Sequence, residues 1–123
     1  MKNGLIVDRD GNQRWYLNGE LHRIGGPAII RITGDKYWYQ NGLLHREDGP
    51  AFVARDGEWA FACKGKLHRE DGPAIEYADG RRYWYLDGRL VTPFGWKKDG
   101  ISVKPIGWEK EGGIIIAACK TEV

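Results

Sequence analysis

The sequence predicts an all-β fold: a single twisted antiparallel sheet of repeated β-hairpins, followed by a small C-terminal β-hairpin module. The first observation is a 23-residue period in the glycine, aromatic and histidine positions. The second is composition, because 18 glycines, six tryptophans and six tyrosines in 123 residues are typical of short strands and tight turns packed by aromatic rings. The third is that apolar residues lack helical spacing and each unit is too short for a strand plus a crossover helix.

The period is seen in several residue types at once. Glycines of one turn recur at Gly11, Gly34, Gly57 and Gly80, and those of a second turn at Gly19, Gly42, Gly65 and Gly88. An aromatic residue precedes the second turn at Trp15, Trp38, Phe61 and Trp84, and a His-Arg pair follows it at His22-Arg23, His45-Arg46 and His68-Arg69. A Gly-Pro dipeptide closes each copy at 26–27, 49–50 and 72–73.

Two parts are expected along the chain. Residues 1–92 form the repeat sheet, with a half-repeat cap at 1–11 and 23-residue units running to about 90, where Val91 and Thr92 replace the expected His and Arg. Residues 93–123 form a separate β module, since Pro93 to Gly100 is echoed twelve residues later by Pro105 to Gly112. The apolar stretch 113–118 closes this module, and we expect it to be paired or buried.

Within a unit, two strands and two turns are expected. The aromatic run 36–40 is the first strand, and Asn41-Gly42 favours the positive φ angles of a tight turn. Pro50 has no N–H to donate, so it precedes the second strand 51–55, which ends at Asp56-Gly57. The large apolar residues that open the second strands are the predicted core, namely Ile29, Phe52 and Ile75, with Ile6 extending the row.

Charge and cysteine content limit the classes of function. The 19 basic and 17 acidic residues give a net charge of +2 with mixed signs, so no long nucleic acid is expected as a partner. Cys63 and Cys119 have no close cysteine neighbour, which favours buried free thiols. The N-terminus does not read as a signal peptide and no apolar run is long enough for a transmembrane segment. A cytoplasmic protein is therefore expected.

The unit resembles the MORN-type β-hairpin repeat. The residues that carry the resemblance are Trp38-Tyr39, Asn41-Gly42, His45, Gly49 and Asp56-Gly57, with their counterparts one unit away. It covers roughly residues 5 to 90, and it implies a function in scaffolding, protein contacts or membrane-lipid binding. The H-R-x-D-G-P-A variant is similar to repeats of bacterial and bacteriophage proteins, which implies a phage-encoded inhibitor acting in the host cytoplasm. The third unit departs from the pattern with Phe61-Ala62 and Lys64.

Each histidine is expected to act without the other two. Equivalent residues of successive units lie two strands apart, about 9 to 10 Å at a strand spacing of ~4.8 Å. Three histidines at that spacing cannot share one metal ion, so neither a metal nor another cofactor is expected.

Two interpretations of the H-R-x-D-G-P-A loop remain open. In the structural one, His caps backbone groups of the loop while Arg46 pairs with Asp48 and Arg69 with Asp71. In the functional one, the loops line one edge of the sheet and present imidazole and guanidinium groups to an anion. Arg23 is then the best candidate, because Ile24-Gly25 stands where the other loops have Glu-Asp.

The aromatic ladder also has two interpretations. Core packing is favoured for Trp15, Trp38, Phe61 and Trp84. The tyrosines on either side of the tryptophans point to the opposite face of the sheet by alternation, so one aromatic row is open to stack a ring or to form a protein hot spot. Trp96 and Trp108 of the C-terminal module join this surface or lie beneath the tail.

The expected function is non-catalytic binding, because the chain has no recognised catalytic motif and Ser102 is its only serine. A protein partner is the leading hypothesis, and a homo-oligomer is expected from the open sheet edges. The alternatives are a sponge-type binder of a small anionic ligand such as a signalling nucleotide, and a lipid-surface scaffold. The candidate binding residues are Trp15, His22, Arg23, Trp38, Tyr39, His45, Arg46, His68, Arg69, Trp84, Tyr85, Trp96 and Trp108.

Overall fold

The computed structural model describes residues 1–91 and the backbone of residues 96–99 and 102–105. These residues form strands and turns, with no helix among them. The strands of the first half are β1 (Gly4–Val7), β2 (Gln13–Leu17), β3 (Glu20–Leu21), β4 (Ile29–Ile30), β5 (Lys36–Tyr37), β6 (Tyr39–Gln40), β7 (Leu43–Leu44) and β8 (Phe52–Val53). Those of the second half are β9 (Trp59–Ala60), β10 (Ala62–Cys63), β11 (Lys66–Leu67), β12 (Ile75–Glu76), β13 (Arg82–Leu86), β14 (Arg89–Val91), β15 (Trp96–Asp99) and β16 (Ser102–Pro105).

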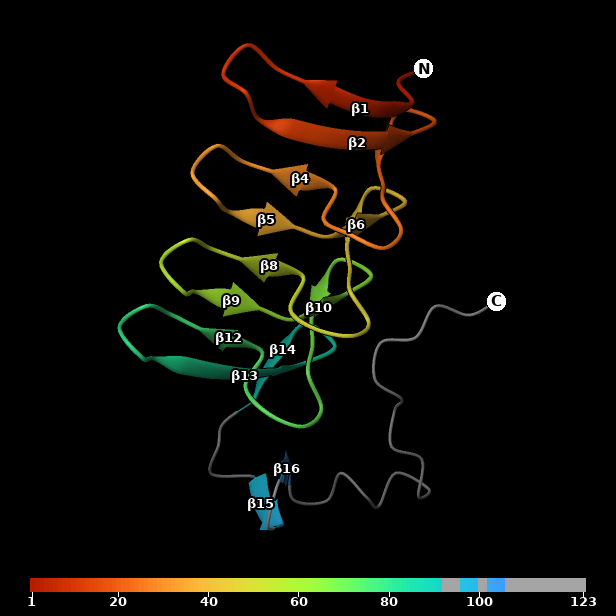
Figure 1. Ribbon diagram of the computed structural model, residues 1–123. Helices are drawn as coiled ribbons and strands as arrows, with labels where there is room; N and C mark the ends of the chain where they lie inside the picture. Colours follow the sequence, from red (N-terminus) through yellow and green to blue (C-terminus); the bar gives the residue numbers. More distant parts are fainter. Residues whose placement is uncertain (92–95, 100–101, 106–123) are drawn as a thin grey trace.

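Most strands belong to one large antiparallel sheet. Its ten strands run in the order β1-β2-β4-β5-β8-β9-β12-β13-β14, with β3 pairing on β2 beside this path. Figure 1 shows the hairpins of successive units lying one below the other, from β1 and β2 at the top to β12 and β13. The predicted all-β antiparallel arrangement of hairpins is confirmed.

In the two middle units the first strand is divided at its central aromatic residue, which the sequence did not predict, whereas β2 and β13 run unbroken through Trp15 and Trp84. The backbone N–H of Trp38 donates to Ala51 O at 2.7 Å in the large sheet, whereas Trp38 O accepts from His45 N at 2.9 Å. The run expected at 36–40 is therefore divided into β5 and β6, and β6 pairs with β7 in a sheet of its own. Phe61 divides β9 from β10 in the same way, with bonds of 2.7 Å to Ala74 O and 3.1 Å from His68 N.

The core differs from the predicted row. Ala28, Ala51 and Ala74 have no exposed surface, and Ile29 is also buried. Phe52 and Ile75 are only half-buried, and Ile6 is exposed. The alanines lie beside the bends and have both backbone groups bonded, as Ala51 does to Ala60 O at 2.8 Å and from Trp38 N at 2.7 Å. A small side chain suits a point where neighbouring backbones converge, while a sheet with little cover leaves the larger row half-exposed.

Side chains join successive units at the turn between the two strands of the large sheet. Asn12 Oδ1 accepts from Ile32 N at 2.9 Å, Asp35 Oδ1 from Arg55 N at 2.8 Å, and Glu58 Oε2 from Ala78 N at 3.3 Å. Each acceptor is 23 residues from the last, as is each donor. The series changes at Arg81, whose Nε donates instead to Asp79 Oδ2 at 2.7 Å.

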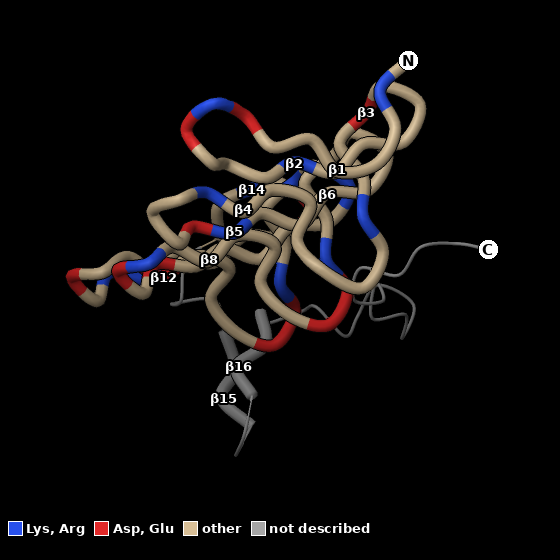
Figure 2. Tube along the Cα trace, turned by 45° about the horizontal axis from the view of Figure 1, so that its top comes forward, with Lys and Arg blue, Asp and Glu red and all other residues tan. Residues whose placement is uncertain are grey.

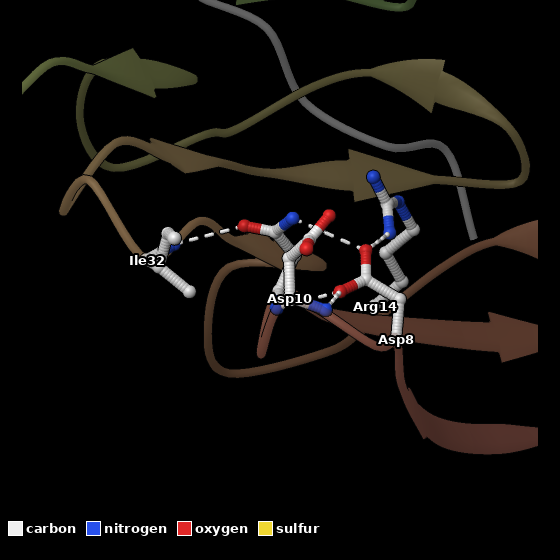
Figure 3. A network of polar contacts seen from close by, with 5 residues as sticks. Asp8, Asp10, Arg14 and Ile32 are labelled. Atoms are coloured by element: carbon white, nitrogen blue, oxygen red, sulfur yellow. Dashed lines mark hydrogen bonds and ion pairs between the residues drawn. The ribbon is translucent and has the colours of Figure 1, made fainter.

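The first of these turns is held by Asp8. Its carboxylate accepts from Asp10 N at 2.9 Å, Asn12 N at 3.0 Å and Arg14 Nη1 at 2.8 Å. Figure 3 shows this network reaching Ile32 in the next unit. The Arg14 guanidinium, with further hydrogen bonds from Asn12, holds the pKa of Asp8 well below its usual range.

Several expectations fall at the C-terminal end. Strands β15 and β16 pair antiparallel with Trp96 opposite Pro105, whereas Trp108 and the stretch 113–118 lie outside the described residues.

Cys63, in the third unit, is disulfide-bonded, so the prediction of a free thiol at this position is wrong. The lack of a close cysteine neighbour in the sequence had favoured a thiol, but closeness along the chain says little about closeness in the fold.

Candidate functional site

The three loops that carry the repeated His-Arg pair lie side by side along the sheet, and we call them loop 1 (residues 22–27), loop 2 (45–50) and loop 3 (68–73). Each begins with a backbone bond to the following unit: Arg23 N donates to Tyr39 O, Arg46 N to Ala62 O, and Arg69 N to Tyr85 O, at 3.1 to 3.3 Å. The loops are thus fixed at one end by the next hairpin. Their arginines and histidines form the candidate site.

The histidines hold the turn of the next unit rather than their own loop. The Nδ1 atoms of His22, His45 and His68 accept from the backbone N–H of Asn41, Lys64 and Asp87 at 2.9, 3.0 and 2.8 Å. All three donor residues have positive φ angles near 50°, as expected for tight hairpin turns. The predicted capping role is correct, but it acts between units.

The histidine environments differ between loops. His45 and His68 are buried, and their Nε2 atoms lie 3.5 Å from Glu47 Oε2 and 3.6 Å from Glu70 Oε2. Because Nδ1 accepts a hydrogen bond, the neutral imidazole carries its proton on Nε2, facing the carboxylate. Loop 1 has Ile24 at the position of these glutamates.

Each arginine packs on the aromatic ring at the bend. The Cζ atoms of Arg23, Arg46 and Arg69 lie 3.9, 4.0 and 4.2 Å from the ring centroids of Trp15, Trp38 and Phe61. Their Nη1 atoms donate to the carbonyls of Pro27, Pro50 and Pro73 at 3.1, 3.1 and 3.2 Å. A guanidinium on an aromatic face is a favourable cation–π arrangement, so the arginines cover the ring row.

A glycine lies close behind each guanidinium. A Cβ atom at Gly26, Gly49 or Gly72 would lie 3.1, 3.0 and 3.0 Å from the Cζ of the loop's arginine. The Gly-Pro dipeptide therefore supplies both the space for the guanidinium and the carbonyl that it binds. Ile24, Gly26 and Gln40, which also line the site described below, were not among the predicted residues. The departure at Ile24-Gly25 was the feature of the sequence that pointed to this loop.

Loop 1 lacks the acid of its counterparts. Arg46 Nε donates to Asp48 Oδ1 at 3.0 Å, and Arg69 Nε to Asp71 Oδ1 at 2.9 Å, which confirms both predicted ion pairs. The equivalent residue in loop 1 is Gly25, with φ of +88°. Among the described residues, no carboxylate forms an ion pair with Arg23.

A cavity of about 420 Å³ lies between loops 1 and 2. Loop 1 lines it from Arg23 to Gly26, and the next unit lines it with Trp38, Gln40 and residues 45–48. Of the predicted site residues, it therefore brings together Arg23, Trp38, His45 and Arg46. Trp15, His22, His68, Arg69, Tyr39, Trp84 and Tyr85 lie elsewhere on the units, and the side chain of Trp96 lies outside the described residues.

The aromatic rings do not form an open platform. Every tryptophan, tyrosine and phenylalanine side chain within residues 1–91 is at least half-buried. The large exposed apolar side chains of this part are instead Leu5, Ile6, Val7, Leu17, Ile24, Ile32, Leu43, Leu90 and Met1. Basic and acidic stretches are interspersed along the tube in Figure 2.

Two absences hold for the described residues. No three His, Cys, Asp or Glu side chains within them are grouped as a metal site requires. That part of the chain also holds no helix with the length and apolar character to cross a bilayer. In comparisons with known proteins, no family model, curated protein or solved structure matches the chain.

Proposed function

We propose that the chain is a non-catalytic protein-binding module, and that it receives an extended segment of a partner protein along strand β1. The observation that carries this proposal is the exposure of an apolar edge strand. β1 is the first strand of the large sheet and pairs only with β2 among the described strands. All four of its residues are exposed, with 49% of Leu5, 39% of Ile6 and 56% of Val7 accessible.

An edge of this kind favours strand addition. The backbone groups of β1 that face away from β2 are available to a new strand, and main-chain hydrogen bonds provide the affinity in such complexes. Leu5 and Val7 project from one face and Ile6 from the other, so a partner with alternating apolar residues meets apolar contacts on both faces. The sequence Gly4-Leu5-Ile6-Val7 contains no lysine, charge or proline that would discourage pairing.

The opposite end of the sheet is less suited to the same partner. β14 has three residues and begins with the exposed Arg89, and short, charged edge strands disfavour strand addition. The edge at β1 is longer and uncharged, whereas the edge at β14 is shorter and begins with a charge. We therefore expect a partner strand to pair with β1.

The test compares two lysine variants in a pull-down from a bacterial lysate. The double variant Leu5→Lys/Val7→Lys places charge on one face of β1, whereas Ile32→Lys places it on an exposed turn outside the edge. We expect the unchanged chain and Ile32→Lys to retain one stoichiometric partner, and the double variant to lose it. Bound partner should also slow amide exchange at residues 4–7.

Two results would count against this function. Equal recovery of the partner by the double variant would remove β1 from the interface. A mass that rises with protein concentration, and that the double variant abolishes, would instead assign the β1 edge to a second copy of the chain. Mass measurement in solution is therefore made before the pull-down is interpreted.

A further inference from the structure

The cavity between loops 1 and 2 contains an arginine that is positioned for a carboxylate but has none. Arg23 makes the same contacts as Arg46 and Arg69: an aromatic ring beneath the guanidinium, a glycine behind it, and a proline carbonyl on Nη1. In the other two loops a fourth contact is an aspartate on Nε, at 3.0 and 2.9 Å. Loops 2 and 3 therefore show where a carboxylate binds an arginine in this loop, and the same position beside Arg23 holds no aspartate.

In loop 1 the position of that acid opens into the cavity. Gly25 replaces the aspartate and has a φ of +88°, while no positive φ occurs at Asp48 or Asp71. Loop 1 therefore follows a different path where its counterparts place a carboxylate. A Cβ at Gly25 would meet no atom within 4 Å, so space remains on this side of the loop.

The charges around the cavity select the type of anion. Of the two acids in its wall, Asp48 binds Arg46 at 3.0 Å and Glu47 lies 3.5 Å from the His45 imidazole. Arg23 lines this wall and forms no ion pair with any residue that the structure describes. One negative charge balances Arg23, whereas a doubly charged phosphate would be repelled by the two carboxylates at short range.

Part of the wall is apolar. Ile24 is 71% exposed beside Arg23, and Trp38 also lines the cavity, together with the polar Gln40. A ligand whose carboxylate meets Arg23 would place its carbon skeleton against Ile24. We propose that this cavity is a binding site for a single carboxylate group, held by the Arg23 guanidinium in the place of the aspartate found in loops 2 and 3.

Two sources supply such a group, namely a free monocarboxylic acid and an aspartate or glutamate side chain of a protein. The site rests on loop 1 and the cavity, and it does not depend on strand addition at β1. If the pull-down experiment on β1 fails, the proposed carboxylate site is unaffected. If the carboxylate titration fails, the proposed interface at β1 is unaffected.

The experiment is a nuclear magnetic resonance titration of the full isotope-labelled chain at constant ionic strength. The probes are acetate, 3-methylbutanoate, aspartate capped at both ends, and inorganic phosphate. The signals followed are the Arg23 Nε–H and the amides of Gly25 and Gly26. We expect the three carboxylates to shift these signals with saturation, and tighter binding by capped aspartate than by 3-methylbutanoate assigns the source to a protein side chain.

The decisive variant converts loop 1 into the sequence of loop 2. Ile24→Glu/Gly25→Asp supplies an internal carboxylate to Arg23 and should weaken carboxylate binding about tenfold or more, as expected for competition with a charge-assisted bond. Arg23→Gln should abolish it, and Arg89→Gln, with the same charge change on β14, should leave it unchanged. Because Gly25 has a φ of +88°, a side chain there strains the loop, so thermal unfolding of the double variant is measured alongside its binding, and Arg23→Gln tests the site without changing the backbone of loop 1.

The proposal is overturned by three results. The first is that no carboxylate shifts the Arg23 and loop 1 signals with saturation. The second is that carboxylates shift these signals equally in the unchanged chain and in Ile24→Glu/Gly25→Asp. The third is that phosphate binds more tightly than all three carboxylates.

Discussion

The Nδ1 atom of His45 accepts a hydrogen bond from the backbone N–H of Lys64 at 3.0 Å, nineteen residues further along the chain. A side chain in one loop thereby fixes a left-handed turn residue, with φ of 49° at Lys64, in the following hairpin. The bond recurs from His22 and His68. It is a repeated side-chain link between units on the loop side, in addition to the backbone bonds from Arg23, Arg46 and Arg69.

Removing the acceptor at His45 should destabilise the chain, and restoring it should recover part of the loss. His45→Ala leaves the Lys64 N–H without its partner and empties a buried site, so we expect a loss of about 2 to 3 kcal/mol in the free energy of unfolding. His45→Asn keeps an acceptor at a similar position and should lose less. Urea unfolding measures both. Equal losses would mean that ring packing, not the acceptor, is what His45 contributes.

The Arg46 guanidinium and Gly49 should be energetically coupled. A Cβ at position 49 would meet Arg46 Cζ at 3.0 Å, so Gly49→Ala should shift the guanidinium slightly and weaken its contacts with the Trp38 ring and Pro50 O. Arg46→Ala alone should lower stability by about 1 kcal/mol, and Gly49→Ala should cost less in that background than in the unchanged chain. A double-mutant cycle measures the difference. Additive losses would show that the glycine serves backbone conformation alone.

The contribution of Asp8 to stability should depend on pH. Hydrogen bonds from Arg14 and then Asn12 lower the pKa of Asp8 in the folded chain, so the carboxylate stabilises the fold above the ordinary aspartate pKa of about 4. This stabilisation falls as pH drops below that value and is gone below the lowered pKa. Asp8→Asn should therefore be less stable at neutral pH, and the gap should narrow only in strongly acidic solution.

Thermal unfolding between neutral and strongly acidic pH measures this gap. Asp10→Asn changes a neighbouring exposed carboxylate in the same turn and serves as the control. A gap for Asp8→Asn that stays constant through the acidic range would contradict the assignment.

Asn3 should act as the cap of the first unit. Its Oδ1 accepts from Asn18 N at 2.9 Å, and Lys2 O accepts from Gly19 N at 2.8 Å, where later units use a histidine Nδ1 and a leucine carbonyl. Asn3→Ala should therefore raise amide exchange at Asn18 and in β1 while leaving β12 and β13 protected. Uniformly faster exchange throughout the sheet would show that the whole array unfolds as one unit.

Much of the fold followed from the sequence because the period placed each turn. The Asn-Gly turns have the expected positive φ at Asn18 and Asn41, and Lys64 and Asp87 adopt it as well. The Arg46–Asp48 and Arg69–Asp71 pairs were predictable because both partners lie in one short loop, where few geometries are available.

Other features were not predictable, for reasons that the repeat itself creates. In a repeated sequence each histidine has an equivalent turn in its own unit and in the next, and the spacing alone does not choose between them. The bend at Trp38 depends on its N–H and C=O bonding to different sheets, and no residue type specifies this division. Large apolar residues were expected in the core, but Ala28, Ala51 and Ala74 are its fully buried members, and of the predicted row only Ile29 is buried.

The cap at Lys2 and Asn3 has a consequence for how this chain can change in length. The hairpin turn of each unit donates to a carbonyl and to a side-chain acceptor of the preceding unit, and Leu44 with His45 supplies the same two acceptors as Leu67 with His68. Removing residues 45–67 joins Leu44 to His68 and returns every later donor to an equivalent acceptor. A deletion that is not a multiple of 23 residues breaks this equivalence, and one that shifts a strand by a single residue turns its side chains to the other face. We therefore expect the fold to tolerate deletions only in steps of 23 residues, the length of one repeat unit.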